Sequence, residues 1–191
     1  MEIATRETSE FTGNANFWRV SSDSSTENGF MRVYIESTIP SYVVARPARD
    51  LLQAARQQLA KDWWDWERNK HELFTSQVVL DEIAFGEKEM AERRLETMRS
   101  VPLLRVTDEV KKLAEKILAS ALLPATADRD ATHIALASVY EMDILLTWNS
   151  RHIANAAIRL RLRKVVEAAG FTLPVICTPE ELVETDDEQS D

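Results

Sequence analysis

The chain has 191 residues, 45% of them hydrophobic and 29% charged, with one cysteine and a net charge of −9. This length suits a single domain with a sizeable core, and one cysteine excludes both an internal disulfide and a cysteine-rich zinc site. That cysteine, Cys177, is expected to be a small buried hydrophobic residue. Acidity usually disfavours nucleic acid, because affinity for phosphate comes largely from lysine and arginine. Here residues 1–30 carry −3 and residues 180–191 carry −7, so residues 31–179 are left at +1 and an RNA substrate is permitted.

The two ends of the chain differ from its body in composition. Residues 1–30 are rich in Ser, Thr, Asn and Glu and show neither a helical nor a strand period, which predicts a disordered extension. Because a strand-like run begins at Met31, one hypothesis is that translation starts there. Residues 184–191 predict an acidic disordered tail, so we expect the folded domain at 31–183. With neither a signal-peptide pattern nor a stretch of roughly 18 apolar residues, a cytoplasmic protein without a membrane partner is expected.

Short apolar runs and segments of helical periodicity alternate along the chain. In chain order they predict a strand at 31–35, a helix at 52–66, a strand at 72–75, helices at 76–86 and 90–98, a strand at 103–106, helices at 107–117 and 128–140, a strand at 143–148, helical sequence up to Gly170, and a strand at 174–177. Strands separated by helices pair in parallel through right-handed crossovers. The expected fold is α/β in three layers, with a central, mainly parallel sheet flanked by helices.

The helix at 52–66 has a clear apolar pattern. Leu52, Ala55, Leu59, Trp63 and Trp66 recur at steps of three and four residues. Such a stripe lies along one side of an α-helix. We therefore predict that this side, with its two tryptophans, packs against the core or an interface.

Four oxygen-bearing side chains are expected at one edge of the sheet. Glu36 directly follows the strand at 31–35, and Asn149 follows the strand at 143–148. Ligands of open parallel sheets bind outside the carboxyl ends of the strands. Glu82 and Asp130 lie on crossover helices that can approach the same edge. Carboxylate oxygens are the ligands that Mg²⁺ prefers, so the pattern suggests a metal site whose ion activates a water molecule.

Each of these residues also has a structural explanation that the sequence leaves open. Glu36, Asp128 or Asp130 could cap a helix, Glu82 could be a solvated helix residue, and Asn149 could belong to a turn. His133 lies three residues after Asp130 on the same helical face, where it could orient that carboxylate. Motifs of serine hydrolases, P-loop proteins, dinucleotide-binding folds and HExxH metalloproteases are missing from the sequence.

Three segments together resemble the PIN-domain family, particularly its VapC-type toxins. They are VYIESTIPSYV near Met31, VVLDEI in the middle, and DATHIALASVYEMDILLTWNSRHIANA late in the chain. The resemblance implies a parallel sheet flanked by helices, a cluster of acids that binds Mg²⁺ or Mn²⁺, and endonucleolytic hydrolysis of RNA. The family's acidic positions fall on Glu36, Glu82 and Asp130, the fourth falls on Asn149, and the hydroxyl motif falls on Ser37 and Thr38.

Two departures from the family pattern bear on activity. The first position is Glu36 where the family typically has aspartate, and the fourth is the neutral Asn149 where the family often has an acid. Metal affinity is then expected to be weaker, with Glu36, Glu82 and Asp130 holding an ion and Asn149 orienting a water. The rival hypotheses are a catalytically degenerate PIN-like module that binds protein or RNA, and a phosphotransfer or phosphatase domain, which would need an aspartate in place of Glu36.

The resemblance also implies partners. A VapC-like protein would cleave RNA, pair with an antitoxin that blocks the site, and form a homodimer. Basic residues gather late in the chain, beginning with Arg151, where they could contact the RNA backbone or form a solvated helix face. The residues expected to make that contact are Arg159, Arg161, Arg163 and Lys164.

Overall fold

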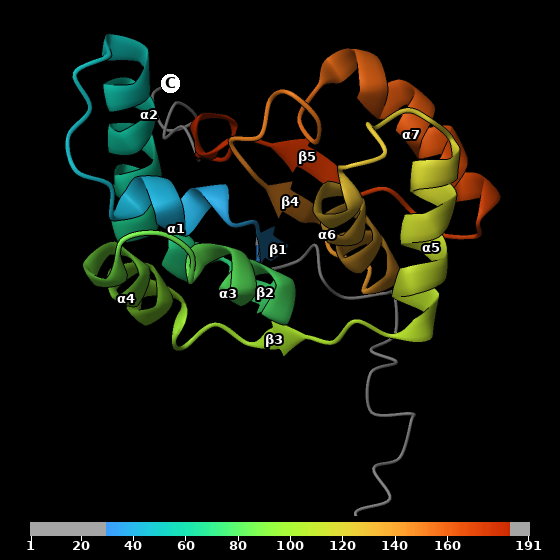
Figure 1. The fold of residues 1–191 in the computed structure, drawn as a ribbon, viewed down its shortest axis with the longest axis horizontal. Coiled ribbons are helices and arrows are strands. Elements are labelled where there is room, and N and C mark those ends of the chain that lie inside the picture. The colour runs from blue at the N-terminus through green and yellow to red at the C-terminus, as the bar shows by residue number, and fades with distance from the viewer. Residues whose placement is uncertain (1–29, 184–191) are drawn as a thin grey trace, which may run out of the picture.

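The computed structural model describes residues 30–183 (Figure 1). The predicted N-terminal extension, apart from its last residue, and the predicted acidic tail lie outside the described residues. The start of translation at Met31 stays a prediction. Within residues 30–183, no helix combines the length and the apolar character needed to cross a membrane.

One five-stranded sheet forms the centre of the described structure. Its spatial order is β3-β2-β1-β4-β5, and every neighbouring pair is parallel. The prediction of an α/β fold around a mainly parallel sheet is confirmed, and the sheet is parallel throughout. The strands are β1 (Arg32–Ile35), β2 (Glu72–Ser76), β3 (Leu103–Leu104), β4 (Ile144–Leu146) and β5 (Val175–Cys177).

The helices cover the sheet in two groups. From β1 the chain adds β2 and then β3 on one side of β1, and afterwards adds β4 and then β5 on the other side. Because right-handed crossovers in opposite directions lie on opposite faces of a sheet, the two groups of helices cover different faces. Figure 1 shows α1 to α4 gathered on one side and α5 to α7 on the other. The first group is α1 (Thr38–Val43), α2 (Leu51–Asp62), α3 (Gln77–Ile83) and α4 (Lys88–Met98); the second is α5 (Asp108–Ala119), α6 (Asp128–Val139) and α7 (Ala156–Ala168).

The strand order creates a switch point between β1 and β4. These strands are neighbours, but the connection after β1 leads toward β2 and the connection after β4 leads toward β5, in the opposite direction. A crevice at the carboxyl ends of two such strands is the usual ligand site of open α/β sheets. Glu36 directly follows β1 and Asn149 lies three residues beyond β4, so the fold brings both to the carboxyl edge of these strands, the place where such a crevice would lie.

The core explains why β1 occupies the centre. Val33, Tyr34 and Ile35 are fully buried, as expected for a strand covered on both faces. Cys177 on β5 is buried too, which confirms the sequence-based prediction, and burial raises the pKa of its thiol to about 12. The thiol therefore stays protonated and behaves as an apolar side chain.

The predicted helix at 52–66 is correct in place but wrong in its buried face. The α-helix ends at Asp62 and continues as a π-helical turn over Trp63–Glu67, which has wider hydrogen-bond spacing. The wider turn directs both Trp63 and its neighbour Trp64 inward and leaves Trp66 73% exposed. At the other end Leu52 is 63% exposed, because α2 packs on α1 and on the turn at Pro179–Glu181 rather than on the sheet.

The sequence after β4 is a loop before it is a helix. Helix α7 begins only at Ala156, where Asn155 accepts a hydrogen bond from the backbone N–H of Ala157. Earlier in this loop the side chain of Asn149 accepts a hydrogen bond from the backbone N–H of His152 at 3.2 Å. Both asparagines bond to nearby backbone in place of the helical ladder, which delays the helix and shapes the loop beside the crevice.

Candidate active site

Three hydroxyl groups hold the Glu36 side chain at the end of β1. Its Oε2 accepts hydrogen bonds from the backbone N–H and the hydroxyl of Thr38, and from Thr147 Oγ1 at 2.8 Å. Its Oε1 accepts one from Ser37 Oγ at 2.7 Å. A carboxylate has about four acceptor positions, so most of this capacity is used on Oε2 and some remains on Oε1. The side chain is buried and firmly oriented toward the crevice.

Glu82 reaches the crevice from the last turn of α3. Helix α3 starts immediately after β2, where Ser76 Oγ accepts a hydrogen bond from the backbone N–H of Val79. The Oε2 of Glu82 lies 3.0 Å from His133 Nε2, and its Oε1 lies 3.8 Å from the Arg129 guanidinium. Burial raises the pKa of Glu82, but the hydrogen bond and charge of His133, the hydrogen bond of Ser37 and the charge of Arg129 together hold it below its ordinary value.

Behind Glu82, the hydrogen bonds continue through the core. His133 Nδ1 lies 2.8 Å from the Tyr34 hydroxyl, which lies 2.8 Å from Ser76 Oγ. One assignment leaves no donor without an acceptor: Ser76 donates to Tyr34, Tyr34 donates to His133 Nδ1, and His133 Nε2–H donates to Glu82. Burial raises the pKa of Tyr34 above its ordinary value, so its phenol remains a donor.

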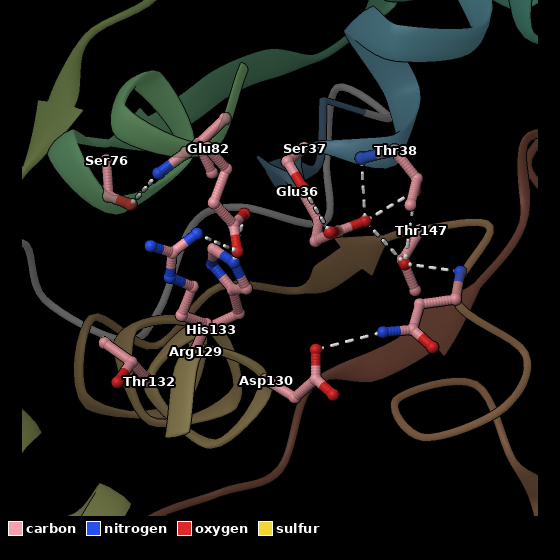
Figure 2. Close-up of polar contacts among 12 residues, drawn as sticks. Glu36, Ser37, Thr38, Ser76, Glu82, Arg129, Asp130, Thr132, His133 and Thr147 are labelled. Carbon is pink, nitrogen blue, oxygen red and sulfur yellow. Dashed lines mark hydrogen bonds and ion pairs between the residues drawn. The ribbon is translucent and has the colours of Figure 1, made fainter. Parts of the chain in front are cut away.

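Asp130 faces the crevice from the first turn of α6, as Figure 2 shows. Its Oδ1 accepts a hydrogen bond from Asn149 Nδ2 at 3.0 Å, and its Oδ2 lies 2.6 Å from His152 Nδ1. Burial raises the pKa of Asp130, and the negative charge of Glu36 adds to this, although the His152 contact opposes it. The net shift is upward, and its largest cause is the burial of the carboxyl group.

The donor set fits a divalent cation. One ligand atom each from Glu36, Glu82 and His133 lies within 4.8 Å of the other two. Both ring nitrogens of His133 already have hydrogen-bond partners, so we assign the ligand role to the two carboxylates. Asp130 lies outside this group, which suits contact through water. Carboxylate oxygens are the ligands that Mg²⁺ and Mn²⁺ prefer.

The structure excludes some of the structural roles that the sequence left open and supports others. The N-cap of α6 is Ala127, without a side-chain cap, so neither Asp128 nor Asp130 caps that helix. Glu82 is not a solvated residue, since its side chain is 17% exposed. Glu36 does bond the first turn of α1, and Asn149 does serve its turn, so these two residues combine a local role with their place at the site.

The remaining predicted residues divide between the site and its surroundings. Ser37 and Thr38 both hold Glu36, in line with the hydroxyl motif. His133 bonds to Glu82, whereas the sequence suggested that it orients Asp130. Asp128 is exposed, and its backbone carbonyl accepts a hydrogen bond from Thr132.

The basic residues of α7 are engaged with backbone or lie in solvent. Arg159 is partly buried and donates to the carbonyl of Ile176 at 2.6 Å, and Arg161 donates to Ala157 in its own helix. Arg163 and Lys164 are exposed on the same helix. Of the four, Arg161, Arg163 and Lys164 present their charge to solvent, whereas the guanidinium of Arg159 braces the last strand.

Sequence reasoning missed four residues of the site: Tyr34, Arg129, Thr147 and His152. A hydroxyl on Tyr34 in the middle of an otherwise apolar strand was a signal of a buried polar contact, and Thr147 stands in a similar run. His152 follows Asn149 by three residues, within the late segment on which the resemblance was based. Its contact with Asp130 depends on the loop that replaces the expected helix, so spacing alone could not reveal it.

Comparison of the chain with protein-family models, with curated proteins and with solved structures finds no match.

Proposed function

We propose that this protein is a metal-dependent endoribonuclease whose ion is held at the carboxyl edge of the sheet by Glu36 and Glu82, with Asp130 acting through water. The observation that carries the proposal is the convergence of Glu36 and Glu82 at the switch point between β1 and β4. The burial that raises the pKa of Asp130 supports it, because a nearby cation would offset the cost of keeping this carboxylate charged.

The protein's own residues would each have a defined task. Glu36 is oriented by the hydroxyls of Ser37, Thr38 and Thr147. Asp130 is oriented by Asn149 and His152. Such outer contacts commonly tune the residues that bind a metal. When bound, Mg²⁺ or Mn²⁺ would lower the pKa of an attacking water and stabilise negative charge on the phosphate.

Arg129 gives the site a positive charge that would attract the phosphate groups of a substrate. Its side chain is about half exposed and lies 3.8 Å from Glu82. A phosphodiester that approaches the crevice would meet this positive charge beside the acids. The bond cleaved would be a phosphodiester of RNA, which is the chemistry implied by the resemblance to PIN domains.

A cleavage assay tests the proposal. Wild-type protein is incubated with a mixed-sequence, single-stranded RNA in Mg²⁺, in Mn²⁺ and with EDTA, beside Glu82→Gln and Asp130→Asn. Asp128→Asn is the matched control, because it removes a nearby acid that is solvent-exposed. We expect metal-dependent cleavage that falls about 10²- to 10³-fold in the two site variants and is unchanged in the control. Cleavage that persists with EDTA, or equally in all variants, would contradict the proposal.

A degenerate binding module is the second candidate, favoured by a specific observation. The position of the fourth family acid holds Asn149, whose amide serves Asp130 and whose carbonyl serves the turn. Metal binding without RNA cleavage on any tested RNA would favour this module. An antitoxin partner and a homodimer follow from the same resemblance and remain predictions.

A further inference from the structure

The chain of hydrogen bonds behind Glu82 is costly for a protein core. Tyr34, Ser76 and His133 are all fully buried, and each places polar atoms where apolar side chains would pack without any need for partners. Buried networks of this kind must be fully satisfied, and this one is. Packing alone therefore does not explain why these residue types occupy the core.

The network links the three elements that surround Glu82. Tyr34 belongs to β1, His133 belongs to α6, and Ser76 ends β2 and caps α3. Glu82 is carried by α3, so the network fixes both the start of that helix and the carboxylate near its end. Figure 2 shows His133 directed at Glu82, with Arg129 alongside.

Tyr34 also sets the hydrogen on the histidine ring. Because the Tyr34 hydroxyl donates to Nδ1, the ring's hydrogen lies on Nε2, where it points at Glu82 Oε2. Without Tyr34, Nδ1 has no partner in the core and the Glu82 contact alone orients the ring, so the ring can tilt away from its present position. The orientation of the Glu82 carboxylate thus depends on the Tyr34 hydroxyl, which is two hydrogen bonds away.

We propose that Tyr34 and His133 are positioning residues that fix the Glu82 carboxylate for a divalent cation. This inference rests on the proposed metal site, but it concerns residues that do not themselves touch the ion. Outer-shell partners of metal ligands typically change metal affinity about 10- to 100-fold when they are removed. A purely structural role would instead change stability and leave the affinity of the folded protein unaltered.

The test measures Mn²⁺ affinity, by electron paramagnetic resonance of free Mn²⁺, in wild type, Tyr34→Phe, His133→Gln and His133→Ala. Tyr140→Phe is the matched control, because Tyr140 donates to the Arg105 carbonyl at an exposed position. We expect about 10- to 100-fold weaker binding in Tyr34→Phe and His133→Ala, and unchanged binding in the control. Gln at position 133 keeps a donor for Glu82, so it should recover part of the affinity.

The outcomes separate this inference from the proposed function. Wild-type affinity in folded Tyr34→Phe would overturn the positioning role while leaving the metal site intact. No binding by the wild type would overturn the metal site, and the inference with it. If Tyr34→Phe does not fold, the two His133 variants decide: equal affinities for Gln and Ala would contradict the role, and partial recovery by Gln would support it.

Discussion

Glu82 and Asp130 are each paired with a histidine at the same edge of the sheet, but the two pairs are built differently. His133 is 1% exposed in its side chain and belongs to a satisfied buried network, whereas His152 is 23% exposed and stands on the loop after β4. The pKa shifts have opposite signs, downward for Glu82 and upward for Asp130. A shared partner type therefore does not decide the electrostatics. Burial raises the pKa of both carboxyls; at Glu82 it is outweighed by His133, Ser37 and Arg129 together, whereas at Asp130 it outweighs His152.

The largest difference is expected when each histidine is removed. His133→Ala leaves Tyr34 without its acceptor and opens a cavity in the core, so we expect it to lower the free energy of unfolding by about 3 kcal/mol. His152→Ala should cost less than about 1 kcal/mol, because solvent can replace its contact. Urea denaturation of the metal-free proteins measures both. Similar losses in the two variants would contradict the contrast between a buried pair and a loop pair.

A second, smaller contrast is expected for Glu82 itself. A carboxyl whose pKa is lowered by folding adds stability above its unfolded pKa and loses it as pH falls through the folded value. Glu82→Gln should therefore lower the free energy of unfolding at neutral pH by about 1 to 2 kcal/mol and flatten its decline in acid. Unfolding curves at a series of pH values check this, and an unchanged acid decline would contradict it.

Asp130 should behave in the opposite sense. Because folding raises its pKa, the metal-free native state binds more protons than the unfolded chain, and stability falls as pH rises between the two pKa values. Asp130→Asn removes this cost while keeping an acceptor for Asn149. We expect its melting temperature without metal at neutral pH to equal or exceed that of the wild type. A lower melting temperature than that of Glu82→Gln would argue against a raised pKa of Asp130 in the native state.

The smallest effect lies outside both pairs, on α7. If Arg161 and Arg163 contact RNA phosphates, replacing both with Gln should reduce the slope of log affinity against log salt by about 0.7 for each lost contact. Arg159→Gln should not be added to this double variant, because Arg159 donates to the Ile176 carbonyl and its loss would disturb β5. Fluorescence anisotropy at several salt concentrations measures the slope. An unchanged slope would make the basic residues of α7 a solvated face.

Periodicity and strand-end reasoning reached the fold and much of the edge, for physical reasons visible in the structure. Alternating apolar runs and helices require parallel crossovers, and the polar residue after a buried strand must emerge at the carboxyl edge, so Glu36 and Asn149 were accessible from sequence. The inward face of residues 52–66 was not, because the π-helical turn at Trp63–Glu67 breaks the period on which that prediction relied.

The histidines that contact Glu82 and Asp130 were harder to predict than the two carboxylates themselves. His133 lies three residues from Asp130 along α6, which suggested a contact within the helix, but its ring crosses to Glu82 on α3. Likewise His152 meets Asp130 only because Asn149 and Asn155 interrupt the expected helix. These two contacts join residues 51 and 22 positions apart and depend on how the elements pack. Spacing along one element carries no information about them.

The central claim is that this edge binds a divalent cation through its carboxylates, and calorimetric titration of Mn²⁺ tests it most directly. The titration compares wild type with Asp130→Asn and with Asp128→Asn as the exposed control. We predict saturable binding by the wild type and by Asp128→Asn, and binding lost or greatly weakened in Asp130→Asn. No wild-type binding at millimolar Mn²⁺, or equal binding by all three proteins, would contradict the account.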